Sequence, residues 1–166
     1  GALAARRGSP VAWHARGVDG DRLADVVARV PLLPRAAPAY VVVSVGVNDV
    51  TGFTSLLKWQ SGLLELTTAL RERFPAAIPI FLGLPPLASF PCIPRPLSWV
   101  LGARAALLDS VMARTAKLLG NTRWLDMRGM FDPSLLASDG FHPGASAHTR
   151  MGEALVELVE DVGASA

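Results

Sequence analysis

The pattern of hydrophobic residues along the chain predicts buried strands that alternate with helices. Residues Tyr40–Val45 form a nearly unbroken run of apolar, largely β-branched side chains, which is typical of a strand buried on both faces of a parallel sheet. Three shorter runs are also interpreted as strands: Val11–Ala15, Ile78–Leu82 and Thr122–Leu125. We expect these runs to form one parallel sheet.

Helices are predicted between the strands by apolar residues at helical spacing. Residues 1–7 have the character of the last turns of a helix, which ends at Gly8-Ser9-Pro10. Asp21 and Thr54 are the predicted caps of the next two helices. The remaining predicted helices cover Arg22–Arg29, residues 55–74, Leu97–Leu119 and Ala147–Val162. This alternation indicates an α/β fold.

The composition narrows the class of protein. The chain has 166 residues, 51% of them hydrophobic, which is enough for one domain with a substantial core. The net charge is only +2 and the basic residues are scattered, so nucleic acid is not an expected partner. No apolar run approaches the roughly 18 residues of a membrane span, so stable membrane insertion is not expected. Cys92 is the single cysteine, which excludes an internal disulfide.

Location and assembly are not fixed by the sequence. No signal peptide is visible, which slightly favours the cytoplasm. The first residue is Gly1 rather than Met, so the compartment stays open. The oligomeric state is unknown from these residues.

Polar residues gather where two predicted strands end. Gly46-Val47-Asn48-Asp49 places an amide and a carboxylate at the carboxyl end of a buried strand, the edge where open α/β sheets bind ligands. An ordinary strand-to-helix turn would explain the same residues, since Asn and Asp favour turns. Asp139-Gly140-Phe141-His142 lies in the long loop after the last strand, and Gly17-Val18-Asp19-Gly20-Asp21 follows the first.

The ordered set of these blocks resembles the SGNH (GDSL-type) hydrolases, a family of esterases and lipases. Residues 46–49 match a Gly-x-Asn-Asp block, residues 139–142 match an Asp-x-x-His block, and residues 17–21 resemble the glycine block that precedes both. The resemblance implies a flavodoxin-like three-layer α/β/α sandwich with a parallel sheet, as one domain over residues 1–166. It also implies hydrolysis of a small-molecule carboxylic ester without a metal or other cofactor.

Particular roles follow from the resemblance. His142 would be the general base, and Asp139 would hold it in the correct tautomer. The backbone N–H of Gly20 and the side-chain amide of Asn48 would donate to the oxyanion. A neutral amide suits this task because it aims a donor at developing negative charge without adding a second acid. Asp49 cannot donate when ionised, and is interpreted as a structural residue that holds the Asn48 turn.

The proline-rich, apolar segment Leu84–Pro96 follows a strand and therefore lies at the same edge as Asn48. It is too broken for a helix and too apolar for a solvated loop. It is either a lid packed for stability or the wall of an acyl pocket, and its position favours the pocket. The candidate substrate-binding residues are Leu84, Pro85 and Phe90.

The sequence departs from the family because it contains no Gly-Asp-Ser, the block that carries the nucleophile at the end of the first strand. Ser9 and Ser44 are not placed to replace that serine. We therefore expect a domain that lacks its first strand and, as given, is nearly inactive, since a triad enzyme loses about a millionfold in rate without its nucleophile. The alternative is a non-catalytic, ligand-binding relative. A flavodoxin-like cofactor binder is disfavoured because no glycine-rich phosphate loop is present.

The missing strand has a structural consequence. In the strand order 2-1-3-4-5 it would lie between Val11–Ala15 and Tyr40–Val45. One edge of Tyr40–Val45 should therefore be open, unless Val11–Ala15 closes onto it or another chain fills the gap. If neither happens, we expect a poorly folded chain that aggregates through this edge.

Overall fold

The computed structural model describes residues 2–164 and has the expected α/β architecture. Its described strands are β1 (Tyr40–Val43), β2 (Ile78–Leu82) and β3 (Arg123–Leu125), which run parallel in the order β1-β2-β3. The prediction of a parallel sheet is confirmed, with β1 ending two residues earlier than expected.

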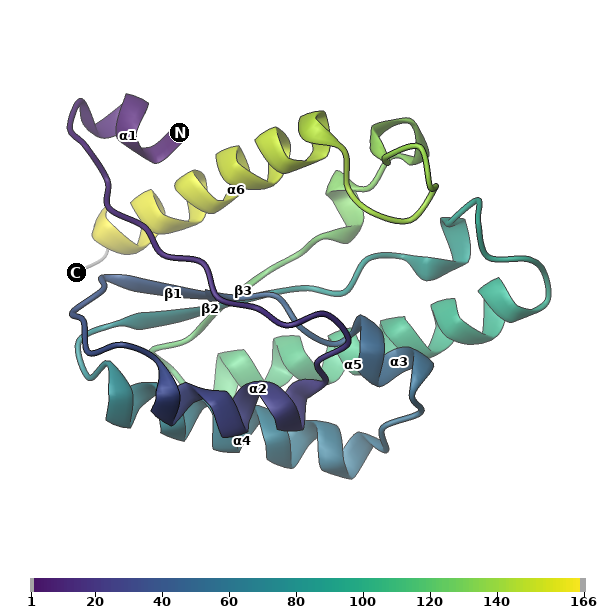
Figure 1. Cartoon of the computed structure of the whole chain (residues 1–166), viewed down its shortest axis with the longest axis horizontal. Helices are drawn as coiled ribbons and strands as arrows, with labels where there is room; N and C mark the ends of the chain where they lie inside the picture. The colour runs from purple at the N-terminus through teal and green to yellow at the C-terminus, as the bar shows by residue number, and fades with distance from the viewer. Residues whose placement is uncertain (1, 165–166) are drawn as a thin grey trace.

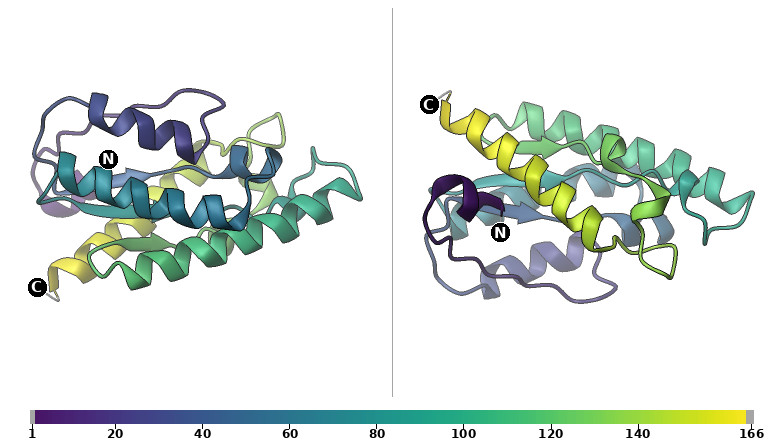
Figure 2. Two further views of the ribbon diagram at one scale, coloured as in Figure 1. Left: turned by 90° about the horizontal axis from the view of Figure 1, so that it is seen from below. Right: turned by 90° about the horizontal axis from the view of Figure 1, so that it is seen from above.

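Helices cover both faces of the sheet, which gives three layers (Figures 1 and 2). One face carries α1 and α6, and the other carries α2, α4 and α5, while α3 lies beyond the carboxyl end of β1. Their bounds are α1 Ala2–Arg7, α2 Leu23–Arg29, α3 Val47–Thr51, α4 Leu56–Arg73, α5 Leu97–Leu118 and α6 Ala145–Ala164. Short 3₁₀ turns are η1 Val30–Leu32, η2 Leu87–Ser89, η3 Arg128–Met130 and η4 Pro133–Leu135. No described helix is both long and apolar enough to cross a membrane.

Both predicted helix caps were wrong. Asp21 instead pairs with Arg29, whose Nε lies 2.8 Å from its carboxylate, and the Asp25 carboxylate accepts the N–H of Arg22 at the start of α2. Ser55 caps α4, because its hydroxyl accepts the N–H of Lys58. Arg22 occupies the N-cap position of α2, where its backbone N–H is satisfied by Asp25 of the first turn, and Ser55 occupies the N-cap position of α4.

The strand predicted at Val11–Ala15 is absent. This segment is coil that joins α1 on one face to α2 on the other, passing outside β1 (Figures 1 and 2). Among the described residues, no hydrogen bond links it to β1, and the side chain of Trp13 is 78% exposed. A short apolar run becomes a strand only where a neighbour takes up its backbone hydrogen bonds, and here the outer edge of β1 carries none. Val42, on that strand, is 47% exposed.

The turn from β1 into α3 depends on Gly46. Its φ of 123° is a conformation that favours glycine, and a Cβ there would lie 2.7 Å from side-chain carbons of both Leu84 and Trp59. The indole of Trp59 is fully buried and donates to the carbonyl of Leu108 at 2.9 Å, which ties α4 to α5. The chain therefore turns sharply into α3 against a fixed part of the core.

Candidate active site

Asn48 lies in α3 and is joined to the loop that precedes α2. Its Nδ2 donates to the carbonyl of Asp21 at 3.0 Å. The adjacent Asp49 is buried and accepts from the N–H of Leu23 at 2.9 Å and from the hydroxyl of Thr54 at 2.8 Å. These are the hydrogen bonds of a structural residue, as predicted for Asp49. They bring the Gly-x-Asn-Asp block and the glycine block together.

The same loop places Gly20 beside the Asn48 turn. Gly20 has a φ of 83° and directly precedes Asp21, whose carbonyl accepts from Asn48. A side-chain amide has two N–H donors. One N–H of Asn48 is used by Asp21, so the second remains for another acceptor at this edge of the sheet.

Asp139 and His142 form a close pair. Nδ1 of His142 lies 2.6 Å from Oδ2 of Asp139, the contact that the sequence predicted. Oδ1 of the same carboxylate accepts the backbone N–H groups of Phe141 at 2.9 Å and His142 at 3.0 Å. The hydrogen bond from the His142 ring, followed by these backbone donors, lowers the pKa of Asp139 to about 2. The carboxylate is therefore ionised at neutral pH and orients the ring.

The two groups lie beyond the same edge of the sheet. Asn48 is in α3, directly after β1, and the Asp139–His142 pair is in the loop between β3 and α6, at the same end of the strands in Figure 1. His142 is largely exposed, with 71% of its side chain accessible. Within the described part of the chain, no hydrogen bond links Asn48 to His142. The structure thus places two separate hydrogen-bonded pairs beyond the same edge of the sheet (Figure 1).

The candidate pocket residues lie mostly in the core. Leu84 and Phe90 are buried in the main hydrophobic cluster, and Pro85 is half-buried. The packing role that the sequence allowed for Leu84–Pro96 is therefore present. A contact between these three residues and a substrate stays a prediction.

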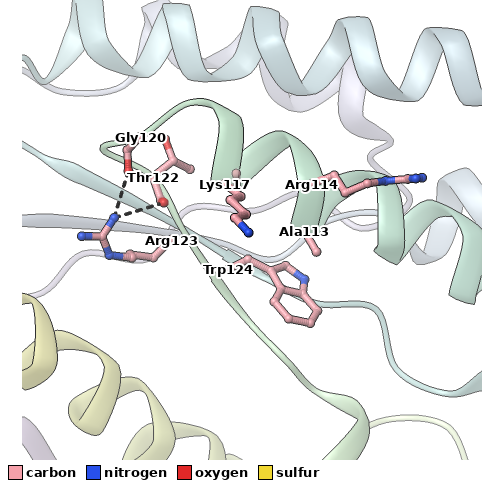
Figure 3. Close-up of a pocket in the computed structure, with 8 residues that line it drawn as sticks. Ala113, Arg114, Lys117, Gly120, Thr122, Arg123 and Trp124 are labelled. Carbon is pink, nitrogen blue, oxygen red and sulfur yellow. Dashed lines mark hydrogen bonds between the residues drawn. The ribbon is translucent and has the colours of Figure 1, made fainter.

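A cavity of about 510 Å³ lies elsewhere, between the end of α5 and the start of β3 (Figure 3). It is lined by Trp124 and by the basic residues Arg114, Lys117 and Arg123, and by none of the predicted site residues. Arg123 donates to the carbonyl of Gly120 at 2.9 Å, just past the end of α5. A cation is favoured at a helix carboxyl terminus, so this charge serves the helix end.

Sequence reasoning missed Asp109, a buried carboxylate on α5. Its Oδ1 accepts the N–H of Leu84 at 3.0 Å and the indole N–H of Trp124 at 3.1 Å, and Arg128 Nε lies 3.7 Å from Oδ2. Burial raises the pKa of Asp109. The available signal was its place in the predicted helix Leu97–Leu119, directly after Leu108 and one helical turn after Ala105, so that it shares a face with apolar residues.

In the described residues, no group of three or more His, Cys, Asp or Glu side chains is placed to hold an ion.

The structure is an α/β domain with a His–Asp pair and a side-chain amide beyond one edge of its sheet, and comparison with known proteins gives the family. A sequence model described as the GDSL-like lipase/acylhydrolase family matches residues 1–150. The chain belongs to this family of hydrolases. No curated protein matches the sequence.

Solved structures, an esterase and a lipase among them, share the fold. TesA is 24% identical with a TM-score of 0.69, over 92% of this chain and 79% of that one. A variant of Axe2, an acetyl xylan esterase from Geobacillus stearothermophilus, is 17% identical with a TM-score of 0.64, over 94% and 76%. An extracellular lipase from Streptomyces rimosus is 17% identical with a TM-score of 0.55, over 86% and 76%.

Proposed function

We propose that this chain carries the acid–base and oxyanion groups of a serine esterase or lipase that hydrolyses small carboxylic esters. The observation that carries the proposal is the 2.6 Å contact between His142 Nδ1 and Asp139 Oδ2. This contact leaves Nε2, the other ring nitrogen, available as a base. The nucleophilic serine is proposed to come from a Gly-Asp-Ser block, which these 166 residues do not contain.

Each proposed residue has one task. Nε2 of His142 takes the proton of the serine hydroxyl as the serine oxygen bonds to the ester carbonyl carbon. It returns that proton to the alcohol oxygen as the carbon–oxygen bond breaks, and then activates water in the same way to release the acid. Asp139, ionised at neutral pH, stabilises the imidazolium formed in each step.

The negative charge that develops on the carbonyl oxygen of the ester needs hydrogen-bond donors, on the side of the ester away from His142. The second N–H of Asn48 and the backbone N–H of Gly20 are the proposed donors, and the bond from Asn48 to the Asp21 carbonyl supports this by bringing the amide to the Gly20 loop. The Asp49 carboxylate stabilises this arrangement by accepting hydrogen bonds from the Leu23 N–H and the Thr54 hydroxyl. Fixed donors cost no reorganisation during the reaction.

The test is hydrolysis of short p-nitrophenyl esters by two proteins. The 166-residue chain should show no more turnover than its own His142→Ala variant. A longer chain that carries a Gly-Asp-Ser segment ahead of residue 1 should hydrolyse the esters, and His142→Ala should abolish this. In the longer chain, Asn48→Ala should lower kcat by roughly 10²–10³, the usual cost of one oxyanion donor.

A binding measurement beside this assay decides the alternative, a binding module that has lost its serine. Binding of a product acid and alcohol, with no His142-dependent turnover, by a natural chain in which no Gly-Asp-Ser precedes residue 1 would favour that module. Turnover by the 166 residues that depends on His142 would show instead that another residue of this chain is the nucleophile.

A further inference from the structure

The loop that carries the Asp139–His142 pair, residues 131–144, makes hydrogen bonds that are local. In the part of the chain that the structure describes, all of them stay within residues 128–148. The N–H of Ala137, for example, donates to the carbonyl of His142 at 2.8 Å. Such bonds shape the loop but do not fix its position relative to the sheet. Apart from the packing of its 3₁₀ turn η4 on α6 and the approach of Gly140 to Cys92, where an added Cβ would lie 3.6 Å from the Cys92 backbone N, its position comes from side-chain contacts.

Aromatic rings supply those contacts. The ring of Phe90 stacks on Phe131 with centroids 4.8 Å apart and planes 8° from parallel. It also meets Phe141 edge to face, at 5.4 Å and 76°. Phe141 in turn meets the imidazole of His142 edge to face, at 5.2 Å and 76°. These separations and angles are those that aromatic pairs prefer, and they connect Phe90 to His142 through one intervening ring.

Phe90 is itself held firmly. Its side chain is buried in the core, as is that of Leu87 in the preceding turn. The segment is anchored at its start by the hydrogen bond from the Leu84 N–H to Asp109 on α5. It also lies close against α5, since a Cβ on Gly102 would be only 2.5 Å from the Cβ of Ala88. The segment is therefore a rigid support on which a loop can rest.

We propose that Phe90 is a positioning residue for His142, acting through Phe131 and Phe141. Its ring contacts Phe131, eight residues before Asp139, and Phe141, which lies between Asp139 and His142, so that the imidazole stays beyond the carboxyl ends of the strands. The catalytic consequence rests on the proposed function, but the positioning itself does not need a substrate. Leu84–Pro96 thus acts as a platform for the histidine loop, whether or not it also contacts an acyl chain.

The test uses the 166-residue chain with two matched substitutions. Phe90→Leu keeps an apolar side chain but removes the ring, and Phe74→Leu is the control. Phe74 is also a buried core phenylalanine, but it lies at the end of α4, where the chain turns towards the start of β2. Both variants should lose some global stability, so only an effect confined to Phe90→Leu concerns the histidine loop.

Two measurements report on the pair without an ester. The first is amide exchange of Phe141 and His142, whose N–H groups donate to Asp139. Loss of two aromatic pairs should speed this exchange roughly 10- to 100-fold in Phe90→Leu and leave it unchanged in Phe74→Leu. The second is the ¹⁵N spectrum of the neutral His142 ring. It should show hydrogen on Nδ1 in the wild type and a shift towards Nε2–H in Phe90→Leu.

A second variant tests the same aromatic contacts in case the Phe90→Leu protein does not fold. Phe141 is only partly buried, so Phe141→Leu should fold and show the same loss of protection at His142. Folded Phe90→Leu and Phe141→Leu proteins with unchanged exchange and an unchanged Nδ1–H signal would overturn the positioning role. If the pair is lost in Phe90→Leu, but a longer serine-bearing chain hydrolyses no ester, the positioning role stands and the proposed function fails.

Discussion

The buried carboxylate of Asp109 provides the sharpest stability prediction. It is the hydrogen-bond acceptor for the Leu84 N–H and the Trp124 indole N–H. Asp109→Ala removes this acceptor and leaves both donors unpaired in a buried or half-buried place. An unsatisfied buried donor costs roughly 1–3 kcal/mol, so the two together cost about 2–6 kcal/mol. This is a large share of the 5–15 kcal/mol typical of a domain.

Asp109→Asn separates the acceptor from the charge. The amide oxygen can accept from Leu84 and Trp124, and the NH₂ group replaces the oxygen that faces Arg128 at 3.7 Å. Arg128 is about half exposed and already paired with Asp126, so losing this attraction should cost little. Urea unfolding at pH 7, followed by circular dichroism, should find the Asn variant at least about 2 kcal/mol more stable than the Ala variant. Equal stability of the two variants would refute the role of Asp109 as an acceptor.

The pH dependence tests the effect of burial. Because burial raises the pKa of Asp109, the folded protein binds this proton more tightly than the unfolded chain does. Its ionisation therefore lowers stability as pH rises from the unfolded value, about 3.9, through the raised folded value. The stability of Asp109→Asn relative to wild type should increase between pH 4 and pH 7. A relative stability that falls over this range would mean that the charge of Asp109 is favoured by Arg128 more than it is disfavoured by burial.

Three further predictions concern other parts of the domain. Gly46→Ala should destabilise the protein by roughly 2–5 kcal/mol in urea unfolding. The added methyl group would overpack against Leu84 and Trp59, and the backbone conformation at this position favours glycine. A loss below about 0.5 kcal/mol would contradict this packing. Because the pKa of Asp139 is lowered to about 2, its pairing with His142 should persist at pH 4 and weaken only as pH falls towards 2, as ¹³C spectra of the carboxyl group can show. Amide exchange over β1 should alternate, with protection only where an N–H faces β2; uniform protection in a monomeric sample would mean that the outer edge of β1 is paired.

The main elements of the fold were readable from the sequence because their signals are local. Ile78–Leu82 has the bounds predicted for it, and α5 ends one residue earlier than expected. The strand order also follows from the family resemblance, since β1, β2 and β3 correspond to the last three strands of the order 2-1-3-4-5. The failure at Val11–Ala15 has a physical cause: whether a five-residue apolar run becomes a strand depends on a neighbouring strand, which the run itself does not reveal.

Part of the candidate site could be predicted from the sequence. The contact of Asp139 with His142 spans three residues and could be expected from the family resemblance. The hydrogen bond of Asn48 to Asp21 joins positions 27 residues apart, and only the fold shows it. The ring contacts of Phe90 also depend on how distant loops pack. Long-range packing is thus the part that the sequence pattern did not reveal.

We propose that His142 activates a serine that lies outside these 166 residues. Labelling with a fluorophosphonate, followed by mass spectrometry, tests it directly, because the reagent forms a stable bond with an activated serine. We expect no label on the 166-residue chain, and one label on the Gly-Asp-Ser serine of the longer chain, lost in its His142→Ala variant. A His142-dependent label on any residue within positions 1–166, such as Ser9 or Ser44, would show that His142 activates a nucleophile of this chain instead.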